Sequence, residues 1–464
     1  MYKNSNVIQI TIRNFCLKMS KKIYIESLGC AKNQVDSEII LTIAKQKGYE
    51  VTKTAQDADL LFVNTCGFIE SAKEESINTF FSLKNTFPKA KIILGGCLAE
   101  RYNKELELEE ADAIFGNHDL SKFADLLDEL EENDEQIKLA PEYPDPDKDK
   151  DERSEYLSMP RSCYLKISEG CNHRCNYCAI PIIRGPLRSR PFNSIVEEAK
   201  RLIAQGFYEI NLIAQDLGAY GTDFDGKSHF CELLDTLASL DGNFVLRLLY
   251  IHPDTFPIEL IDIVKNNKKI LPYFDIPFQH ASQRVLRGMK RSGNTEKYLA
   301  LIEKIRSNIP EAVIRTTLML GFPGEEREDF DELLRFVKSA RFDWMGSFLY
   351  SREEDTPAYE MRNERDHKKA IKRATPWKSE LEELQSKITE ENLEKFVGKK
   401  YLALVEENIQ GEDLSIARIY SQAPEVDGLT VIMGEGIKPG DVVEVGIRKV
   451  RGVDLEAILI RKVY

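Results

Sequence analysis

The sequence has no long apolar run and no excess of positive charge. No stretch of its 464 residues approaches the ~18 consecutive apolar residues of a membrane-spanning helix, so we expect no membrane partner. Lysine and arginine number 64 against 77 aspartates and glutamates, which gives a net charge of −13. This balance argues against an extended surface for nucleic acid and leaves RNA contact a secondary role. The negative net charge fits a basic protein partner at least as well as a nucleic acid.

The chain also lacks a convincing secretion signal. Polar and charged residues such as Asn4 and Arg13 interrupt the apolar positions near the N-terminus. We expect residues 1–20 to be a disordered extension, and Met1 and Met19 are both candidates for the native start. Nine cysteines, an odd number in a large chain without such a signal, indicate reduced thiols and a cytoplasmic location.

Six of the nine cysteines fall into two trios with different spacing. A complete iron–sulfur or zinc shell normally takes four protein ligands, so three thiolates leave one metal position open. Two incomplete shells indicate an enzyme that uses two metal clusters for chemistry. The compact trio is Cys171, Cys175 and Cys178, and the dispersed trio is Cys30, Cys66 and Cys97.

Residues 21–140 alternate apolar strands with amphipathic helices, which predicts an α/β fold with a doubly wound parallel sheet. Each dispersed cysteine comes just after a predicted strand, and parallel strands end at one shared edge where ligands bind. Three buried structural thiols are the alternative, because free cysteine is often buried. The threefold repeat of strand, turn and cysteine favours a shared metal site. The strand-and-turn segments are 22–30, 60–67 and 91–97, and the helices are 37–47 and 71–87.

Residues 141–158 are acidic and contain prolines, which predicts a solvated linker. Strand-like and helical segments then alternate across residues 159–396. They predict an open TIM-like (β/α)6 barrel with its active site at the carboxyl ends of the strands. The expected strands are 164–168, 209–214, 245–251, 273–278, 314–320 and 344–350.

Residues 397–464 contain short alternating strands separated by glycine turns, which predicts a small β-barrel. A charged helix over 378–396 precedes this module. The expected strands are 401–406, 430–433, 441–447 and 457–460.

The compact trio has the spacing Cys-x3-Cys-x2-Cys, with Tyr177 just before the last cysteine. A tight loop can bring three such thiolates onto one cluster, as ferredoxin loops do. A zinc site would want a fourth ligand, and His173 is badly spaced for that role. The motif resembles the signature of radical S-adenosylmethionine (radical SAM) enzymes. That resemblance implies a [4Fe–4S] cluster on these thiolates, with its open iron bound to S-adenosylmethionine.

With the dispersed trio before it and the β module after it, the chain resembles methylthiotransferases over residues 21–464. That resemblance implies a second [4Fe–4S] cluster, held by the dispersed trio, for the inserted sulfur. Local motifs are similar to the RimO branch, which methylthiolates the β-carbon of an aspartate in a small-subunit ribosomal protein. A branch that modifies an adenosine of transfer RNA is the alternative. The motifs are Ser27-Leu28-Gly29-Cys30-Ala31-Lys32-Asn33, Asn64-Thr65-Cys66-Gly67 and Ala423-Pro424-Glu425-Val426-Asp427-Gly428.

The terminal module resembles a TRAM domain, usually an RNA binder. From residue 399 to residue 464, nine lysines and arginines stand against eleven aspartates and glutamates. An RNA-gripping module would be basic, so this one suits a basic ribosomal protein. The reaction would also need a reductant or electron donor protein and a sulfur source. An electron-transfer or cluster-carrier protein is the non-enzymatic alternative, although a carrier does not need a large barrel.

Three further residues are candidates for contacting the cofactor, and no catalytic side chain is singled out. Gln215 and Gln279 follow predicted strands and point toward the cofactor by position, with ordinary hydrogen bonding as the alternative. Arg315 suits the cofactor carboxylate because guanidinium binds carboxylates in bidentate fashion, with a barrel-lining ion pair as the alternative. A basic cluster follows the cysteine loop and is expected to form a solvated face, with contact to substrate or ribosomal RNA as the alternative; its members are Arg184, Arg188 and Arg190.

Overall fold

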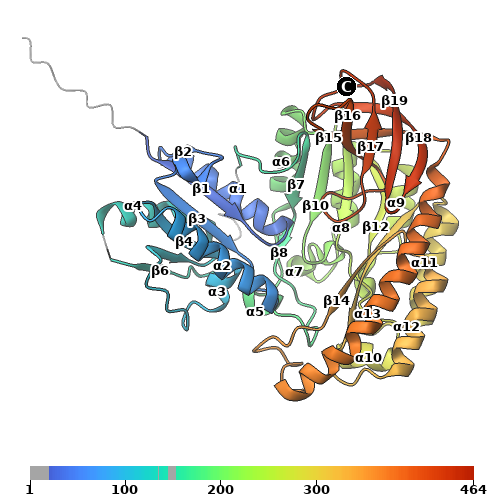
Figure 1. Cartoon of the computed structure of the whole chain (residues 1–464), viewed down its shortest axis with the longest axis horizontal. Helices are drawn as coiled ribbons and strands as arrows, with labels where there is room; N and C mark the ends of the chain where they lie inside the picture. Colours follow the sequence, from blue (N-terminus) through green and yellow to red (C-terminus); the bar gives the residue numbers. More distant parts are fainter. Residues whose placement is uncertain (1–19, 134, 145–152) are drawn as a thin grey trace, which may run out of the picture.

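The structure, a computed structural model, describes residues 20–133, 135–144 and 153–464. Residues 1–19 of the expected extension, including both candidate start methionines, lie outside these ranges, as do residues 145–152 of the expected linker. Figure 1 shows the N-terminal part on one side and the central and C-terminal parts together on the other. Within the described ranges, no helix is long and apolar enough to cross a membrane.

The N-terminal domain is a six-stranded parallel sheet in the order β2-β1-β3-β4-β5-β6. Helices α1 and α4 cover one face, where Ile40 and Phe123 pack on Phe62. Helices α2 and α3 cover the other, where Phe80 and Leu98 pack with the strands. Helices on both faces confirm the predicted doubly wound arrangement. The elements are β1 (Lys22–Ser27), α1 (Ala31–Gln46), β2 (Glu50–Val51), β3 (Leu60–Thr65), α2 (Glu70–Thr86), β4 (Lys91–Gly96), α3 (Cys97–Arg101), β5 (Ala113–Phe115), α4 (Phe123–Glu132) and β6 (Ile137–Leu139).

The central domain is an open parallel sheet of six strands in the order β14-β13-β12-β11-β10-β7. Each expected strand is present, which confirms the predicted open barrel. Both faces are buried, so the strands are rich in apolar residues throughout. A short hairpin of β8 (Ser168–Glu169) and β9 (Arg188–Ser189) flanks the compact cysteine loop. The six strands are β7 (Ser162–Lys166), β10 (Glu209–Ile213), β11 (Val245–Leu249), β12 (Ile270–Asp275), β13 (Val313–Leu320) and β14 (Trp344–Leu349).

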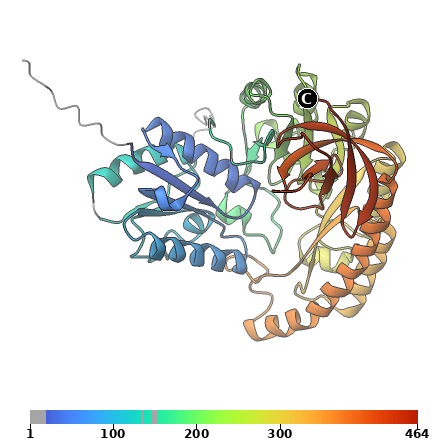
Figure 2. The ribbon, with the colours of Figure 1, turned by 45° about the horizontal axis from the view of Figure 1, so that its top comes forward.

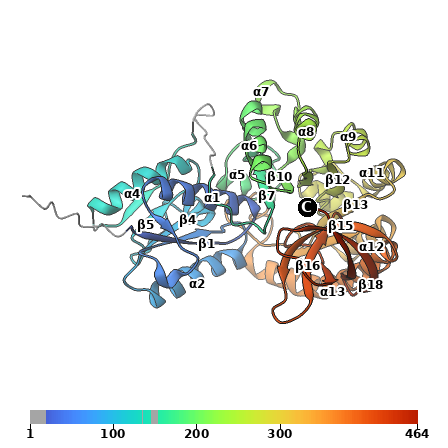
Figure 3. The same cartoon turned by 90° about the horizontal axis from the view of Figure 1, so that it is seen from above.

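Helices line the outer face of this sheet, as Figure 3 shows from above. They bury one large apolar core with the outward side chains of the strands. The helices of this domain are α5 (Ile180–Ile183), which packs against Cys97 of the N-terminal domain, and α6 (Phe192–Ala204), α7 (Thr222–Asp225), α8 (Phe230–Ser239), α9 (Leu260–Asn266), α10 (Gln283–Gly288), α11 (Thr295–Asn308), α12 (Arg327–Ala340) and α13 (Glu364–Leu393).

The C-terminal module is a closed five-stranded barrel in the order β15-β16-β17-β19-β18. Its apolar residues share a core with the sheet face opposite the helices, for example Val405 with Tyr273 and Trp344. Figure 2 shows the barrel seated against that sheet. The small β-barrel was predicted, but strand β16, which pairs with β15 and β17 and is needed for closure, was missed. The strands are β15 (Lys400–Asn408), β16 (Leu414–Ile419), β17 (Thr430–Met433), β18 (Val442–Arg451) and β19 (Asp454–Lys462).

Helix α13 begins 14 residues before the predicted start at residue 378. Asn363 caps it by accepting a hydrogen bond from the backbone N–H of Asp366 (2.9 Å). The helix then runs through Pro376, which removes one backbone donor. Burial of Ala374 and Trp377 on either side of Pro376 offsets that loss, so packing lets the helix continue through the proline.

Candidate active site

The dispersed cysteines meet at the carboxyl edge of the N-terminal sheet. Cys30 precedes α1, Cys66 follows β3, and Cys97 opens α3 directly after β4. Gly29 lies so close to Cys66 that an added Cβ would be 3.3 Å from the Cys66 Sγ atom. The three thiols range from exposed at Cys30, through half-buried at Cys66, to buried at Cys97. One side of the trio is therefore open and the other is enclosed by protein.

The thiol of Cys97 is surrounded by polar groups from two domains. It donates to Asn33 Oδ1 (3.2 Å) and accepts from Asn117 Nδ2 (3.4 Å). Arg184, from the central domain, places Nη2 3.2 Å from the same sulfur. Burial raises the pKa of Cys97 to about 12, and the Arg184 cation opposes that rise. Donors aimed at a sulfur are the environment that an iron–sulfur thiolate requires.

Arg184 belongs to a buried ionic network rather than to the solvated face that we expected. Its Nη1 atom pairs with Asp36 (2.6 Å) and Glu169 (3.2 Å). Lys166 pairs with the same two carboxylates at 2.9 and 3.1 Å. Arg190 is also buried, against Glu198. The prediction was wrong because a local run of arginines does not reveal the carboxylates that distant segments bring to it.

The compact trio lies on a tight loop between β8 and α5. The backbone N–H of Cys178 donates to the carbonyl of Cys175 (3.1 Å), and Cys171 Sγ accepts from the His173 N–H (3.4 Å). Burial raises the pKa of Cys171 to about 11 and that of Cys178 to about 12. The neighbouring thiols contribute to both rises, as expected for three cysteines on one short loop.

The barrel holds this loop from two sides. The backbone N–H of Asn176 donates to the carbonyl of Met289 (3.1 Å), and its carbonyl accepts from Ala358 (2.8 Å). Arg291 donates to the Tyr177 hydroxyl (3.1 Å), so the aromatic residue of the motif is anchored as well. The loop is thereby fixed at the carboxyl ends of the barrel strands.

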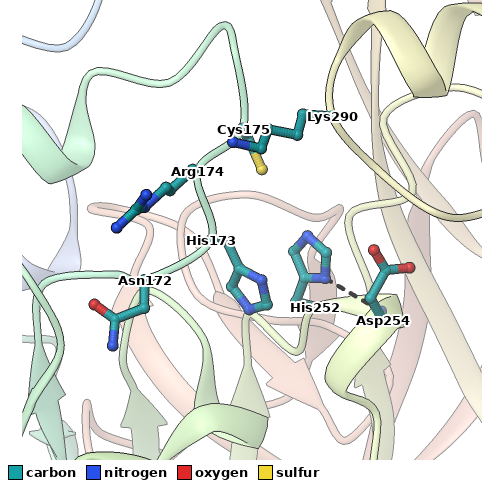
Figure 4. Close-up of a pocket in the computed structure, with 7 residues that line it drawn as sticks. All are labelled: Asn172, His173, Arg174, Cys175, His252, Asp254 and Lys290. Carbon is teal, nitrogen blue, oxygen red and sulfur yellow. Dashed lines mark hydrogen bonds between the residues drawn. The ribbon is translucent and has the colours of Figure 1, made fainter.

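A polar cavity of about 270 Å³ lies beside the loop and includes Cys175 in its lining. Figure 4 shows the rings of His173 and His252 next to each other in its lining; they are stacked, with their centroids 3.9 Å apart. His173 Nε2 lies 2.6 Å from Asp216 Oδ2. Burial and the Arg291 charge lower the pKa of His252. His173 is thus oriented by an acidic side chain and a stacked ring.

The structure places the three predicted cofactor contacts at strand ends or on a strand. Gln215 donates to Glu169 (2.5 Å), while its Oε1 atom is buried without a hydrogen-bond partner among the described residues. Gln279 has a backbone φ of 68°, a left-handed value that is uncommon outside glycine. Arg315 lies between Asp275 (3.1 Å) and Asp427 of the C-terminal barrel (3.4 Å). A cofactor carboxylate at Arg315 would compete with both.

Sequence reasoning missed one buried cation near the dispersed trio. The Lys32 ammonium lies 3.6 Å from the centroid of the Tyr250 ring, at the end of β11. Burial lowers the pKa of Lys32, whereas the Cys30 thiol and nearby carboxylates oppose the change. The signal was available, since Lys32 is part of the Cys30 motif. The sequence alone does not show that the Tyr250 ring faces the Lys32 ammonium.

Across the described ranges, no three histidine, cysteine, aspartate or glutamate side chains are grouped to hold a single metal ion. A cubane cluster makes a different demand, because each thiolate binds its own iron and the sulfurs stand apart. Donors aimed at Cys97, and thiols gathered on the anchored loop, fit such clusters.

Three family models match successive parts of the chain. Residues 22–116 match the uncharacterized protein family UPF0004, residues 165–337 the radical SAM superfamily, and residues 397–460 the TRAM domain. Radical SAM proteins use a [4Fe–4S] cluster and S-adenosylmethionine. The enzyme class predicted from the compact cysteine motif is confirmed.

Solved structures agree on the fold. A radical S-adenosylmethionine methyltransferase from Kitasatospora setae, TsrM, with cobalamin and a [4Fe–4S] cluster bound, has a TM-score of 0.54 at 15% identity. The match covers 73% of this chain and 77% of that one. The same protein with tryptophan and a cofactor analogue bound gives a TM-score of 0.52 at 13% identity, covering 73% and 75%.

Curated relatives match along nearly the whole length. The ribosomal protein uS12 methylthiotransferase RimO of Treponema denticola is 45% identical, covering 93% of this chain and 99% of the relative. The protein of the same name from Clostridioides difficile is 42% identical, covering 94% and 98%. Together with the three domains in this order, these likenesses confirm the RimO resemblance: the chain belongs to the ribosomal protein uS12 methylthiotransferase family of radical SAM enzymes.

Proposed function

We propose that this enzyme attaches a methylthio group to the β-carbon of an aspartate in the small-subunit ribosomal protein uS12. The observation that carries the proposal is a contact between the segments that hold the two cysteine trios. Cys97 packs against Ala179 and Ile183, directly after the compact loop, and Arg184 reaches its sulfur. A centre for radical formation and a centre for sulfur would thus face one substrate carbon.

In this proposal, Cys171, Cys175 and Cys178 hold the cluster that binds S-adenosylmethionine. Together, the bound cluster and cofactor supply radical hydrogen abstraction from carbon. Cys30, Cys66 and Cys97 would hold a second [4Fe–4S] cluster, which would supply the site for the inserted sulfur, and a second S-adenosylmethionine would supply the methyl group. A reductant or electron donor protein and a sulfur source complete the reaction.

The polar residues around the trios have positioning roles. Gln215 has a buried oxygen free for a cofactor donor, and Gln279 is held at a strained strand end of the kind found at ligand sites. Both stay our proposals for cofactor contacts. Arg315 is already paired with two carboxylates, so its contact with the cofactor remains a prediction that a bound structure would test.

The C-terminal barrel is proposed to dock the protein substrate, with any RNA contact secondary. Its residues from 399 onward carry a small net negative charge, which suits a basic ribosomal protein. The relatives' shared name also favours a protein substrate over transfer RNA.

The test offers both substrates to anaerobically reconstituted enzyme with S-adenosylmethionine, reductant and sulfide. Ribosomal protein uS12 and transfer RNA are incubated separately and then analysed by mass spectrometry. A methylthio group on a uS12 aspartate is the expected result. A methylthio group on an adenosine, with uS12 unchanged, would overturn the substrate assignment and leave the cluster chemistry in place.

A further inference from the structure

Lys32 is a buried cation that has no ion pair with any residue the structure describes. It is the second residue of α1, two positions after Cys30, and only 8% of it is exposed. Among the described residues, no carboxylate lies within ion-pair distance of its ammonium. The ammonium lies over the face of the Tyr250 ring. Burying a charge without a partner is costly, so this position favours an anion brought from outside.

The carboxylates around Lys32 already pair with other cations. Glu169 is held by Lys166 and Arg184, at 3.1 and 3.2 Å. Asp275 is held by Arg315 at 3.1 Å. These two carboxylates are therefore already neutralised by other cations, and the exposed Cys30 thiol is a third charged neighbour of Lys32.

The backbone conformation of Tyr250 places its ring against the Lys32 ammonium. It directly follows β11 and has a backbone φ of 70°, a left-handed value that is unfavourable for a residue other than glycine. Its N–H donates to Asp275 Oδ2 (3.2 Å) and its carbonyl accepts from Leu217 (3.0 Å), which hold the strained turn in place. Such strain persists where the surroundings enforce it, typically at ligand clamps.

We propose that Lys32 binds the carboxylate of the substrate aspartate and thereby selects that residue; this inference rests on the proposed function. The carboxylate carbon of aspartate is bonded directly to the β-carbon that reacts. A cation that holds the carboxylate therefore also restricts the position of the reacting carbon, which is one bond away from the carboxylate carbon. The exposed Cys30 thiol is among the groups that act electrostatically on the Lys32 ammonium, so the same contact would bring that carbon toward the open side of the dispersed trio.

Two substrate analogues separate charge recognition from a structural role. A uS12 peptide with its target aspartate is compared with the same peptide carrying asparagine, which has nearly the same shape and no charge. Reconstituted wild-type enzyme should prefer aspartate in kcat/KM, and in peptide affinity measured by fluorescence anisotropy, by about 10- to 100-fold, as for a charge-assisted hydrogen bond.

Lys32→Met should remove this preference, and Lys32→Arg should restore most of it. The matched control is Lys53→Met, which removes an exposed lysine of the same domain and should keep the wild-type ratio. A ratio of two substrates is unaffected by the fraction of active enzyme, so partial misfolding of a variant does not mimic the result.

An equal loss on both peptides, or a Lys32→Met enzyme that still prefers aspartate, would overturn the role of Lys32. Failure of the proposed function has another signature: wild-type enzyme would leave both uS12 peptides unmodified and bind them equally. The inference would then fall together with the substrate assignment.

Discussion

Arg184 of the central domain donates a hydrogen bond to the Cys97 thiol of the N-terminal domain, with 3.2 Å between Nη2 and Sγ. The two residues are 87 positions apart, and the side chain of Arg184 is only 3% exposed. This contact joins the segment after the compact trio to a member of the dispersed trio. Buried charge therefore sets the relative position of the two trios together with apolar packing.

Replacing Arg184 with glutamine should destabilise the domain boundary. The change leaves Asp36 with one cationic partner fewer, and breaking a buried ion pair typically costs about 3–5 kcal/mol. Denaturant unfolding of the cluster-free protein measures the loss. The exposed pair of Arg451 and Glu456 provides the control, since Arg451→Gln should cost less than about 1 kcal/mol. Equal losses of unfolding free energy in the two variants would show that Arg184 contributes little to stability.

Single cysteine substitutions should separate the two trios. We expect Cys175→Ala to abolish cofactor cleavage, and Cys66→Ala to retain some cleavage yet stop sulfur insertion. Release of 5′-deoxyadenosine and the mass of the substrate report the two steps. Cys231→Ala, a half-buried thiol of α8 outside both trios, is the matched control. Methylthiolation by the Cys66→Ala enzyme would make the dispersed trio structural.

Asp216 should prove necessary for the shape of the cavity beside Cys175. Its carboxylate lies 2.6 Å from His173 Nε2, and it accepts hydrogen bonds from the Thr255 hydroxyl (2.6 Å) and the His252 N–H (3.0 Å). Asp216→Asn removes the charge and one acceptor oxygen, which should cost about 1.5–3 kcal/mol of stability. Thermal unfolding and iron content are measured together.

The exposed Asp225→Asn is the comparison for Asp216, since its carboxylate is largely in solvent. We expect little change in either measurement for that variant. If Asp216→Asn bound iron and unfolded like the wild type, Asp216 would not support the cysteine loop.

The stability of the C-terminal barrel against the central sheet should depend on the protonation of Asp427. Burial raises the pKa of Asp427 to about 6, while Arg315, the Tyr273 hydroxyl and Arg247 oppose that rise. The folded state therefore binds the proton more tightly than the unfolded state, whose value is near 3.8. The stabilisation is present below about pH 4 and is lost as pH rises through about 6, an effect of about 3 kcal/mol.

Asp427→Asn tests this pH dependence. Between pH 4 and 7, the free energy of unfolding of the wild type should fall by about 3 kcal/mol relative to that of the variant. Denaturant titrations at several pH values provide both curves. Asp413→Asn, an exposed position in the same barrel, should give a constant difference from the wild type. If the difference in unfolding free energy between Asp427→Asn and the wild type were also constant with pH, the raised pKa of Asp427 would be contradicted.

The local parts of this molecule could be predicted because short-range patterns encode them. Apolar runs bounded by turns located the strands of the central sheet, and the three strand-turn-cysteine repeats followed from chain direction in a parallel sheet. The spacing of Cys171, Cys175 and Cys178 points to one loop, since residues so near in sequence cannot separate. Strand β16 was missed because its pairing partners, not its own composition, close the barrel.

What the sequence alone determined is the enzyme class, the two trios and the order of the domains. Only the tertiary structure decided which distant groups meet: Arg184 with Cys97, Lys32 with Tyr250, and Arg315 with Asp427. Periodicity describes neighbours along one element, whereas these contacts join different domains. Their energies depend on burial and charge, which arise only when the domains pack together.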